Sequence, residues 1–140
     1  MTGGYAAWAG LAAVAAGAAG AVLRWAVVSW LHAALSRRAG SADPFPLGVL
    51  VANTVASLVA GIAVPTAANL GPAWRLVVVA GLCGGLSTLS TLAVDTVALW
   101  QRGRRPAAAV NVAANVALGS AAAWVGAAVI GGRLADVLAG

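Results

Sequence analysis

The chain has 140 residues, of which 62% are hydrophobic and 8% are charged, and its mean hydropathy is +0.96. So few polar side chains cannot cover a soluble globule, which predicts an integral membrane protein. The eight basic residues are all arginine, and with three aspartates and no glutamate the net charge is +5. In a membrane protein such charges lie in loops and at helix ends, where they indicate topology and not nucleic-acid binding.

Four apolar segments are each long enough to cross a hydrocarbon core of about 30 Å, which takes roughly 20 helical residues. They span residues 6–34, 47–68, 74–100 and 107–130. The connections between them are short and leave no room for a second domain. The sequence therefore predicts one all-α transmembrane domain over residues 1–140, in a multi-pass protein of the cell membrane. The uncharged start of the chain predicts no removable signal peptide.

Arg24 is the one charge deep within the first segment. A charge at membrane depth is expensive, so it indicates a functional role. Alternatively, the first helix ends near Arg24 and continues as an interfacial, amphipathic stretch. His32 follows eight residues later, and it is either an interfacial polar residue or a participant in gating or proton sensing.

The second segment carries Asn53 and Ser57, whose spacing of four places both on one helix face. A carboxamide inside a membrane has to find a partner, so this face should meet protein or water. The pair favours hydrogen bonding between helices, worth about 0.6–2 kcal/mol. The alternative is that Asn53 donates a hydrogen bond to a permeating anion.

The third segment contains a stretch, residues 81–92, that predicts a helix break. Its adjacent glycines, Gly84 and Gly85, each cost a helix roughly 1 kcal/mol relative to alanine. Hydroxyl side chains follow within a few residues and offer the backbone other hydrogen bonds. Breaks at membrane depth occur where the backbone lines a polar cavity or is buried in protein, so we expect an ion or substrate site here. The hydroxyl residues are Ser87, Thr88, Ser90 and Thr91.

The fourth segment repeats the pattern of the second, with Asn111 and Asn115 again four residues apart. A polar track between the two helices is the simplest interpretation. Asp95, just beyond the break, is the one acid that could accompany this track.

Three motifs resemble those of the Fluc/CrcB fluoride channels, and together they extend over most of the chain. Residues 20–25, GAVLRW, are similar to the first-helix element G-A-x-x-R-[YFW] of that family. Residues 45–57, FPLGVLVANTVAS, resemble the second-helix element F-P-x-G-T-L-x-V-N-x-x-G-S. Residues 81–92, GLCGGLSTLSTL, resemble the third-helix element G-F-C-G-G-x-T-T-F-S-T-F.

The resemblance implies a four-helix membrane protein with a broken third helix, working as an antiparallel dimer with fluoride pores at the subunit interface. It implies a sodium ion at the dimer centre, held by the backbone carbonyls of Gly84 and Ser87. It also implies that Asn53 supplies the pore amide and that Arg24 lies in the vestibule. The remaining residues implied along the fluoride path are Thr88, Ser90 and Thr91 at the break and Asn111 and Asn115 on the fourth helix, where the family usually has a tyrosine and a serine.

The fluoride path departs from the family pattern at several side chains. Leu89 and Leu92 stand where the family has two phenylalanines whose ring edges face fluoride. A leucine has no quadrupole and cannot present a positive edge. Val49 likewise stands where the family has a threonine. The cation site uses backbone atoms and is preserved, whereas the anion path is altered.

The arginines predict one orientation in the membrane. Five lie in the two connections on one side and two lie on the other, which favours both chain ends outside. A chain that inserts in both orientations should have no such bias, so we expect a heterodimer whose partner inserts the opposite way and supplies the phenylalanines. The five are Arg37, Arg38, Arg102, Arg104 and Arg105, and the two are Arg75 and Arg133.

These observations predict a passive fluoride channel subunit that lowers cytoplasmic fluoride. The first alternative is an auxiliary subunit that completes a heterodimer while its own pore does not conduct. A remote alternative is a small multidrug-type, proton-coupled exporter, but such proteins depend on a membrane-embedded glutamate and this chain has none. One histidine, one cysteine and three scattered aspartates provide no obvious metal site or nucleophile–base pair, so we expect no enzymatic activity.

Overall fold

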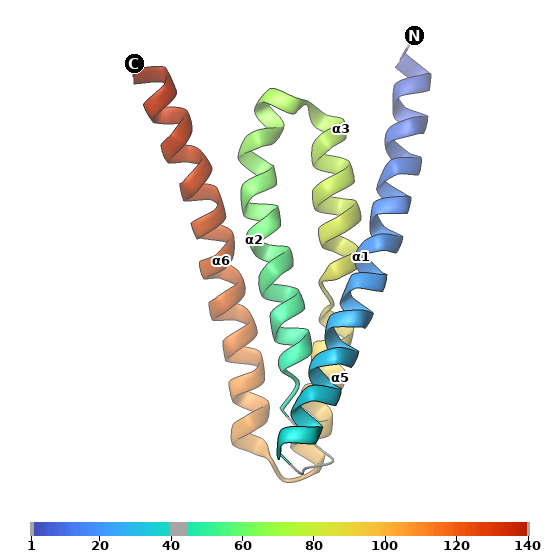
Figure 1. The fold of residues 1–140 in the computed structure, drawn as a ribbon, viewed down its shortest axis with the longest axis vertical. Coiled ribbons are helices and arrows are strands. Elements are labelled where there is room, and N and C mark those ends of the chain that lie inside the picture. Colours follow the sequence, from blue (N-terminus) through green and yellow to red (C-terminus); the bar gives the residue numbers. More distant parts are fainter. Residues whose placement is uncertain (1, 40–44, 140) are drawn as a thin grey trace.

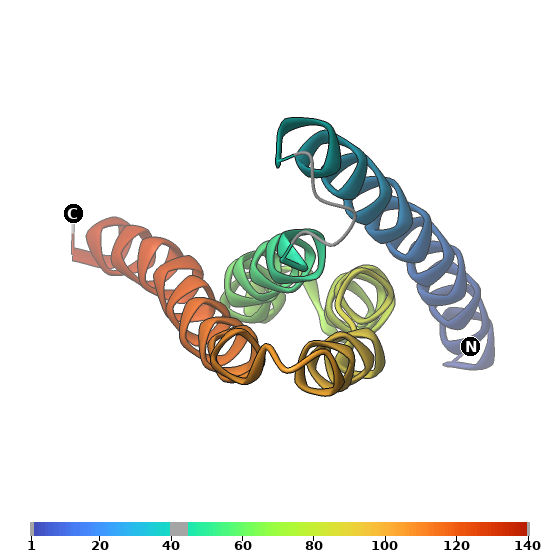
Figure 2. The same ribbon diagram turned by 90° about the horizontal axis from the view of Figure 1, so that it is seen from below.

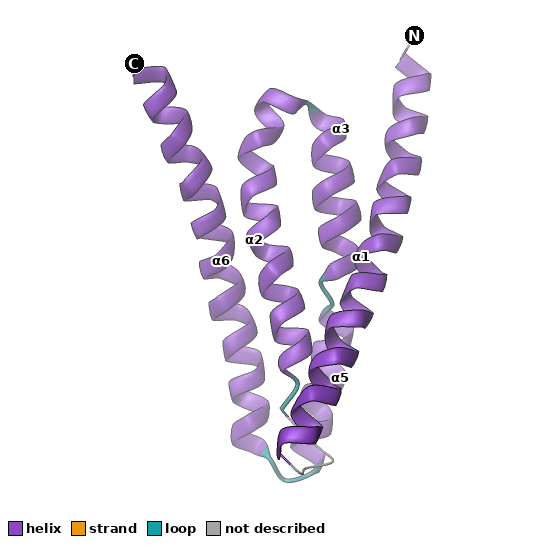
Figure 3. Cartoon of the chain, viewed as in Figure 1, coloured by secondary structure: helices purple, strands orange, loops and turns teal. Residues whose placement is uncertain are grey.

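The computed structural model describes residues 2–39 and 45–139, and the described residues are helical apart from short connections (Figure 1, Figure 3). Four stretches are long and apolar enough to cross a membrane: Ala7–Arg37, Leu47–Thr66, Pro72–Gln101 and Arg105–Gly132. The elements are α1 (Thr2–Ala39), α2 (Leu47–Leu70), α3 (Pro72–Arg75), the π-helical η1 (Leu76–Cys83), α4 (Gly84–Leu86), α5 (Leu89–Gln101) and α6 (Arg105–Ala139).

The third transmembrane segment, made of α3, η1, α4 and α5, forms a hairpin with α2 at the centre of the molecule (Figure 1). Helix α1 packs against η1 and α4, and α6 packs along α2. Both chain ends lie at one end of the molecule, where α1 and α6 splay away from the hairpin on opposite sides (Figures 1 and 2). The end of α1, the start of α2 and the α5–α6 turn lie at the opposite end (Figure 1).

The four predicted segments fall within these helices, but α1 continues without interruption from Thr2 to Ala39. The helix therefore does not end near Arg24, as one alternative expected. The residues after Arg24 include the helix formers alanine and leucine, with neither proline nor glycine before residue 39. Arg24 consequently lies within a transmembrane helix.

Small residues let the helices approach backbone to backbone. A methyl group on Gly81 would lie 2.6 Å from the carbonyl oxygen of Ala13 on α1, and one on Gly126 would lie 2.6 Å from the carbonyl oxygen of Leu58 on α2. A buried cluster that includes Ala52, Ala56 and Cys83 joins α2 to the third segment. Because apolar side chains gain nothing from leaving lipid, such close van der Waals packing is what holds membrane helices together.

Candidate functional site

The helix break lies within the Pro72–Gln101 span, as predicted. Helix α4 ends at Leu86, Ser87 (φ −82°, ψ 156°) and Thr88 (φ −153°, ψ 120°) are extended, and α5 begins at Leu89. Thr88 caps α5, because its Oγ1 accepts a hydrogen bond from the backbone N–H of Thr91 (3.2 Å). Thr88, one of the hydroxyl residues that predicted the break, is therefore the N-cap of the next helix.

The break releases several backbone carbonyls from helical pairing, among them those of Gly84 and Ser87. In a continuous helix the N–H of Thr88 would bond to the Gly84 carbonyl and that of Thr91 to the Ser87 carbonyl. Instead, the N–H of Thr88 donates to Asn53 Oδ1 (2.8 Å), and that of Thr91 donates to the Thr88 hydroxyl. The carbonyls of Gly84 and Ser87 are the ones that the sequence resemblance implies as sodium ligands. Carbonyl oxygens of this kind suit a hard cation.

Arg24 reaches the break from α1. Its Nη1 donates to the Ser87 carbonyl oxygen over 3.2 Å, which joins two residues 63 positions apart. This contact gives the intramembrane charge a hydrogen-bond partner at the break. A carbonyl oxygen has two lone pairs, so Ser87 can accept from Arg24 and still face a cation. The guanidinium charge would nevertheless repel a cation bound at the same oxygen.

Asn53 joins the break to α6. Its Oδ1 accepts the Thr88 N–H, while its Nδ2 donates to Asn115 Oδ1 over 2.8 Å and approaches the Thr88 carbonyl at 3.4 Å. The predicted polar track between the second and fourth helices is therefore present. Both amide N–H groups of Asn53 point at protein acceptors, which agrees with the prediction that this residue bonds helix to helix.

The track continues from Asn115 back to α5. Asn115 Nδ2 donates to the Asn111 carbonyl oxygen (2.8 Å), and Asn111 Nδ2 donates to Thr96 Oγ1 (3.0 Å). The Thr96 hydroxyl in turn donates to the Leu92 carbonyl oxygen (2.7 Å). Asn111 is fully buried, at 0% exposure. These bonds tie α6 to the half-helix that follows the break.

All links of this amide chain, which runs Thr88–Asn53–Asn115–Asn111–Thr96, donate in the same direction. The reason lies at its ends. A backbone N–H can only donate, so it requires the oxygen of Asn53, and the Thr96 proton is already used on its own helix, so Thr96 accepts. Each carboxamide between the ends then has one possible orientation.

Thr96 was missed in the sequence analysis, although a signal for it exists. Thr96 and Asn111 lie at nearly equal distances on either side of the α5–α6 turn, which contains residues 102–104. In an antiparallel pair of helices joined by a short turn, such positions face one another. An isolated hydroxyl opposite a buried amide is therefore a recognisable pattern.

The predicted hydroxyl residues of the break also come together. The Thr88 hydroxyl lies 3.1 Å from the Ser90 hydroxyl and 3.1 Å from that of Thr91. Thr88 is buried, whereas Ser90 is exposed. The break thus presents a compact group of hydroxyls at the start of α5.

A cavity of about 210 Å³ opens beside the break, between α2, α5 and α6. Leu89, at 79% exposure, and the buried Leu92 form its apolar wall. Of the residues predicted along an ion path, Ser90, Thr91 and Asn111 do not line it. The lining residues are Asn53, Ser57, Ser87, Thr88, Leu89, Leu92, Asn115 and Val116.

A second cavity, of about 230 Å³, borders the first. It shares Ser57 and Ser87 with its neighbour and is otherwise lined mainly by small apolar residues and by Gly84. The released Gly84 carbonyl belongs to an exposed residue on this side of the break. Ser57 and Ser87 therefore lie between the two cavities.

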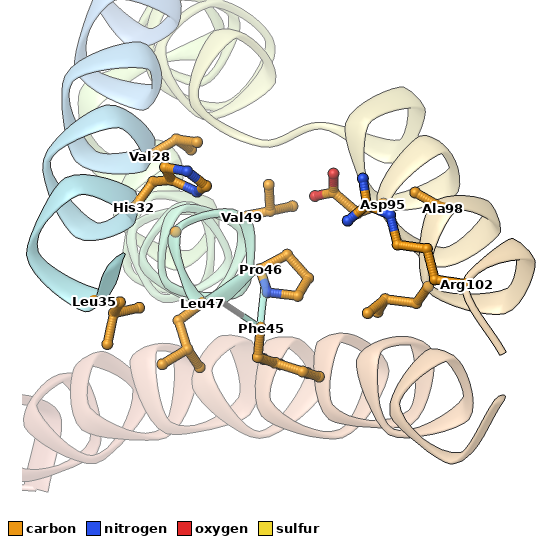
Figure 4. A pocket seen from close by; sticks show the side chains of 12 residues that line it. Val28, His32, Leu35, Phe45, Pro46, Leu47, Val49, Asp95, Ala98 and Arg102 are labelled. Carbon is orange, nitrogen blue, oxygen red and sulfur yellow. The ribbon is translucent and has the colours of Figure 1, made fainter. Parts of the chain in front are cut away.

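A third cavity, of about 220 Å³, lies near the arginine-rich end, between α1, the start of α2 and α5. Figure 4 shows the carboxylate of Asp95, on α5, and the guanidinium of Arg102, just after α5, pointing toward one another. His32 lines the α1 side of the same cavity, beside Val28. The sequence analysis singled out His32 and Asp95, but it did not place them in a common cavity.

Among the described residues no group of three or more histidine, cysteine, aspartate or glutamate side chains could hold a metal ion. A cation at this site would therefore depend on backbone carbonyls, as the resemblance implies. The carbonyls released at Gly84 and Ser87 have the right donor chemistry for such a cation.

A family model described as "CrcB-like protein, Camphor Resistance (CrcB)" matches residues 11–127. The fluoride-specific ion channel FluC of Renibacterium salmoninarum is 40% identical over 113 residues, which are 79% of this chain and 90% of that protein. FluC 2 of Symbiobacterium thermophilum is 42% identical over 120 residues (83% and 93%), and FluC of Pseudomonas aeruginosa is 40% identical over 113 residues (78% and 84%). With four helices able to cross a membrane and a family match over most of its length, the chain is a multi-pass cell-membrane protein of the CrcB family.

Proposed function

We propose that this chain is a subunit of a fluoride channel that exports fluoride passively and so lowers its cytoplasmic concentration. The observation that carries the proposal is a cavity beside a helix break inside a membrane-spanning segment, lined on one side by amide and hydroxyl side chains. The relatives that are named fluoride-specific ion channels, each about 40% identical over most of the chain, support it. No step of such a function needs covalent chemistry.

Fluoride is a small, strongly hydrated anion, and it needs hydrogen-bond donors to replace its water. The Ser57 and Ser87 hydroxyls line the cavity, and no hydrogen bond within the described part of the chain uses either of them. The Asn53 amide is already bonded to Asn115. An entering anion would therefore meet the serine hydroxyls first, and it would reach the Asn53 amide only by displacing Asn115.

The carbonyls of Gly84 and Ser87 would hold a sodium ion at the centre of an antiparallel dimer. A bound sodium ion would supply positive charge that holds two opposed breaks together. The release of these carbonyls by Thr88 and Thr91 supports this assignment. Arg24, bonded to the Ser87 oxygen, would moderate the affinity for the ion.

A heterodimer would explain the exposure of Leu89 and the unequal distribution of arginines between the two ends of the molecule. Leu89 is 79% exposed beside the cavity, where it could meet aromatic rings from a partner that inserts the opposite way. Exposed Arg37, Arg104 and Arg105 lie at one end of the molecule. Arg75 lies near the start of the third segment, at the opposite end of the molecule. This distribution favours one orientation for the chain.

A second function is favoured by the leucines and by the engaged amides: the chain could be an auxiliary subunit whose own pore does not conduct. Fluoride efflux from liposomes, followed with a fluoride electrode, separates the two. The chain is assayed alone and then co-purified with a paralogous four-helix partner. Efflux by the chain alone would reject both the auxiliary role and the need for a heterodimer, whereas efflux by the pair alone would support both. The absence of fluoride efflux from both preparations would reject the channel function.

A further inference from the structure

Asn115 covers the amide of Asn53 from α6. The Nδ2 atom of Asn53 donates to Asn115 Oδ1 over 2.8 Å, and both side chains line the cavity beside the break. An anion can bond to an amide N–H but not to an amide oxygen, so the oxygen of Asn115 occupies the donor that an anion would need. Asn115 is buried, so this contact is shielded from solvent. Asn115 therefore competes with an anion for Asn53.

The backbone fixes the orientation of both carboxamides. A peptide N–H can only donate, and the N–H of Thr88 donates to Asn53 Oδ1 (2.8 Å), so the Nδ2 atom of Asn53 faces α6. A peptide carbonyl can only accept, and the Asn111 carbonyl accepts from Asn115 Nδ2 (2.8 Å), so the Oδ1 atom of Asn115 faces α2. Asn115 therefore cannot turn its own N–H groups toward an anion at Asn53 while it keeps the bond to the Asn111 carbonyl.

The next turn of the same two helices offers a place for the displaced side chain. Ser57 follows Asn53 by four residues on α2, and a methyl group on Gly119 of α6 would lie 3.3 Å from Ser57 Oγ. The absence of a side chain at Gly119 thus leaves space beside this hydroxyl. The Ser57 hydroxyl lines the cavity and has no hydrogen-bond partner within the described part of the chain. Because a buried amide oxygen needs a donor, this hydroxyl makes the displacement of Asn115 less costly.

We propose that Asn115 is the positioning residue that keeps the anion site closed until fluoride displaces it. The inference rests on the proposed channel function and specifies which residue controls access to Asn53. Without an anion, Asn53 donates to Asn115. With fluoride bound, Asn53 donates to the anion, and the oxygen of Asn115 accepts from Ser57. A hydrogen bond to an ion is about twice as strong as one between neutral groups, which is why fluoride competes with an amide oxygen.

Removing the competing oxygen should tighten fluoride binding. The apparent affinity of a site falls in proportion to the fraction of molecules in which the site is open. From the strength of hydrogen bonds between membrane helices, Asn115→Ala should raise the apparent fluoride affinity by about threefold to fifteenfold. Asn115→Leu should do the same, because leucine branches as asparagine does and fills the space without offering an acceptor.

Fluoride titration of the purified, detergent-solubilised chain tests this, with chloride keeping the ionic strength constant. The midpoint is read from the melting temperature and from the NMR signal of the Asn53 amide. Thr96→Val is the matched control, because it removes an acceptor from the same amide chain and leaves the bond between Asn53 and Asn115 in place. This control should leave the fluoride affinity unchanged. In the Asn53→Ala background, Asn115→Ala should give no gain in affinity.

A purely structural role for Asn115 would lower the melting temperature of both variants without raising fluoride affinity, and this result would overturn the proposal. An equal gain in Thr96→Val, or a gain that persists in the Asn53→Ala background, would also overturn it. The absence of fluoride binding and efflux in every variant would reject the proposed function together with this role. Fluoride efflux with an unchanged affinity in Asn115→Ala and Asn115→Leu would reject the role of Asn115 alone.

Discussion

Replacing Thr96 by valine tests whether the amide chain is held from its α5 end. Valine has nearly the shape of threonine, so the substitution leaves no cavity and removes the acceptor for Asn111 (3.0 Å) together with the bond to the Leu92 carbonyl (2.7 Å). Asn111 has 0% exposure, so water cannot replace the lost acceptor of its amide N–H. Stranding a buried donor costs about 1–3 kcal/mol, although hydrogen bonds between membrane helices rarely exceed about 1.7 kcal/mol. We therefore expect the free energy of unfolding to fall by about 1–2 kcal/mol.

Reversible unfolding in mixed micelles, followed by fluorescence of the six tryptophans, measures this loss. Thr54→Val is the matched control, because the Thr54 hydroxyl also donates to the carbonyl four residues earlier, Leu50 (2.8 Å). Thr96→Ser keeps a hydroxyl and should restore most of the stability. If Thr96→Val is no more destabilising than Thr54→Val, Thr96 does not anchor the amide chain.

Three further predictions concern the helix contacts and the break. Gly81→Ala should destabilise the fold by about 1–3 kcal/mol, because the added methyl group would lie 2.6 Å from the α1 backbone. Gly10→Ala, whose methyl group would meet no neighbour, should not destabilise the fold. Equal melting temperatures of the two variants would contradict this prediction. Arg24→Met should increase stabilisation by sodium in thermal unfolding, since it removes a like charge from the Ser87 oxygen, and decreased stabilisation would count against a cation there. Leu89→Phe should change the free energy of unfolding by less than about 0.5 kcal/mol, because the side chain is 79% exposed. The same variant should raise fluoride efflux by the chain alone. Unchanged efflux would show that the missing ring does not limit fluoride permeation.

The transmembrane helices and the break could be predicted because their causes are local. Long apolar runs predict spans, and adjacent glycines followed by hydroxyls predict where a helix stops. The Thr88 cap needs no information beyond a few neighbouring residues. The helix ends were less predictable: α1 and α6 continue beyond the apolar runs, to Ala39 and Ala139. Helix α6 does so despite its adjacent glycines, Gly131 and Gly132, which no hydroxyl residues follow.

The partners of the polar side chains could be predicted less completely. The sequence indicated that Asn53 and Asn115 lie on a shared track, yet the bond from Arg24 to Ser87 joins residues 63 positions apart and depends on how two helices cross. No local pattern predicts that crossing. The role of Thr96 likewise follows from which hydroxyl lies opposite a buried amide.

The one-way amide chain has a consequence for the proton gradient of the cell. Carboxylates and imidazoles can take up a proton on one side and release it on the other, but a neutral carboxamide does neither near neutral pH. Three asparagines in succession, Asn53, Asn115 and Asn111, therefore interrupt proton hopping between the break and α5. The amide chain therefore offers protons no titratable side chain between the break and Thr96.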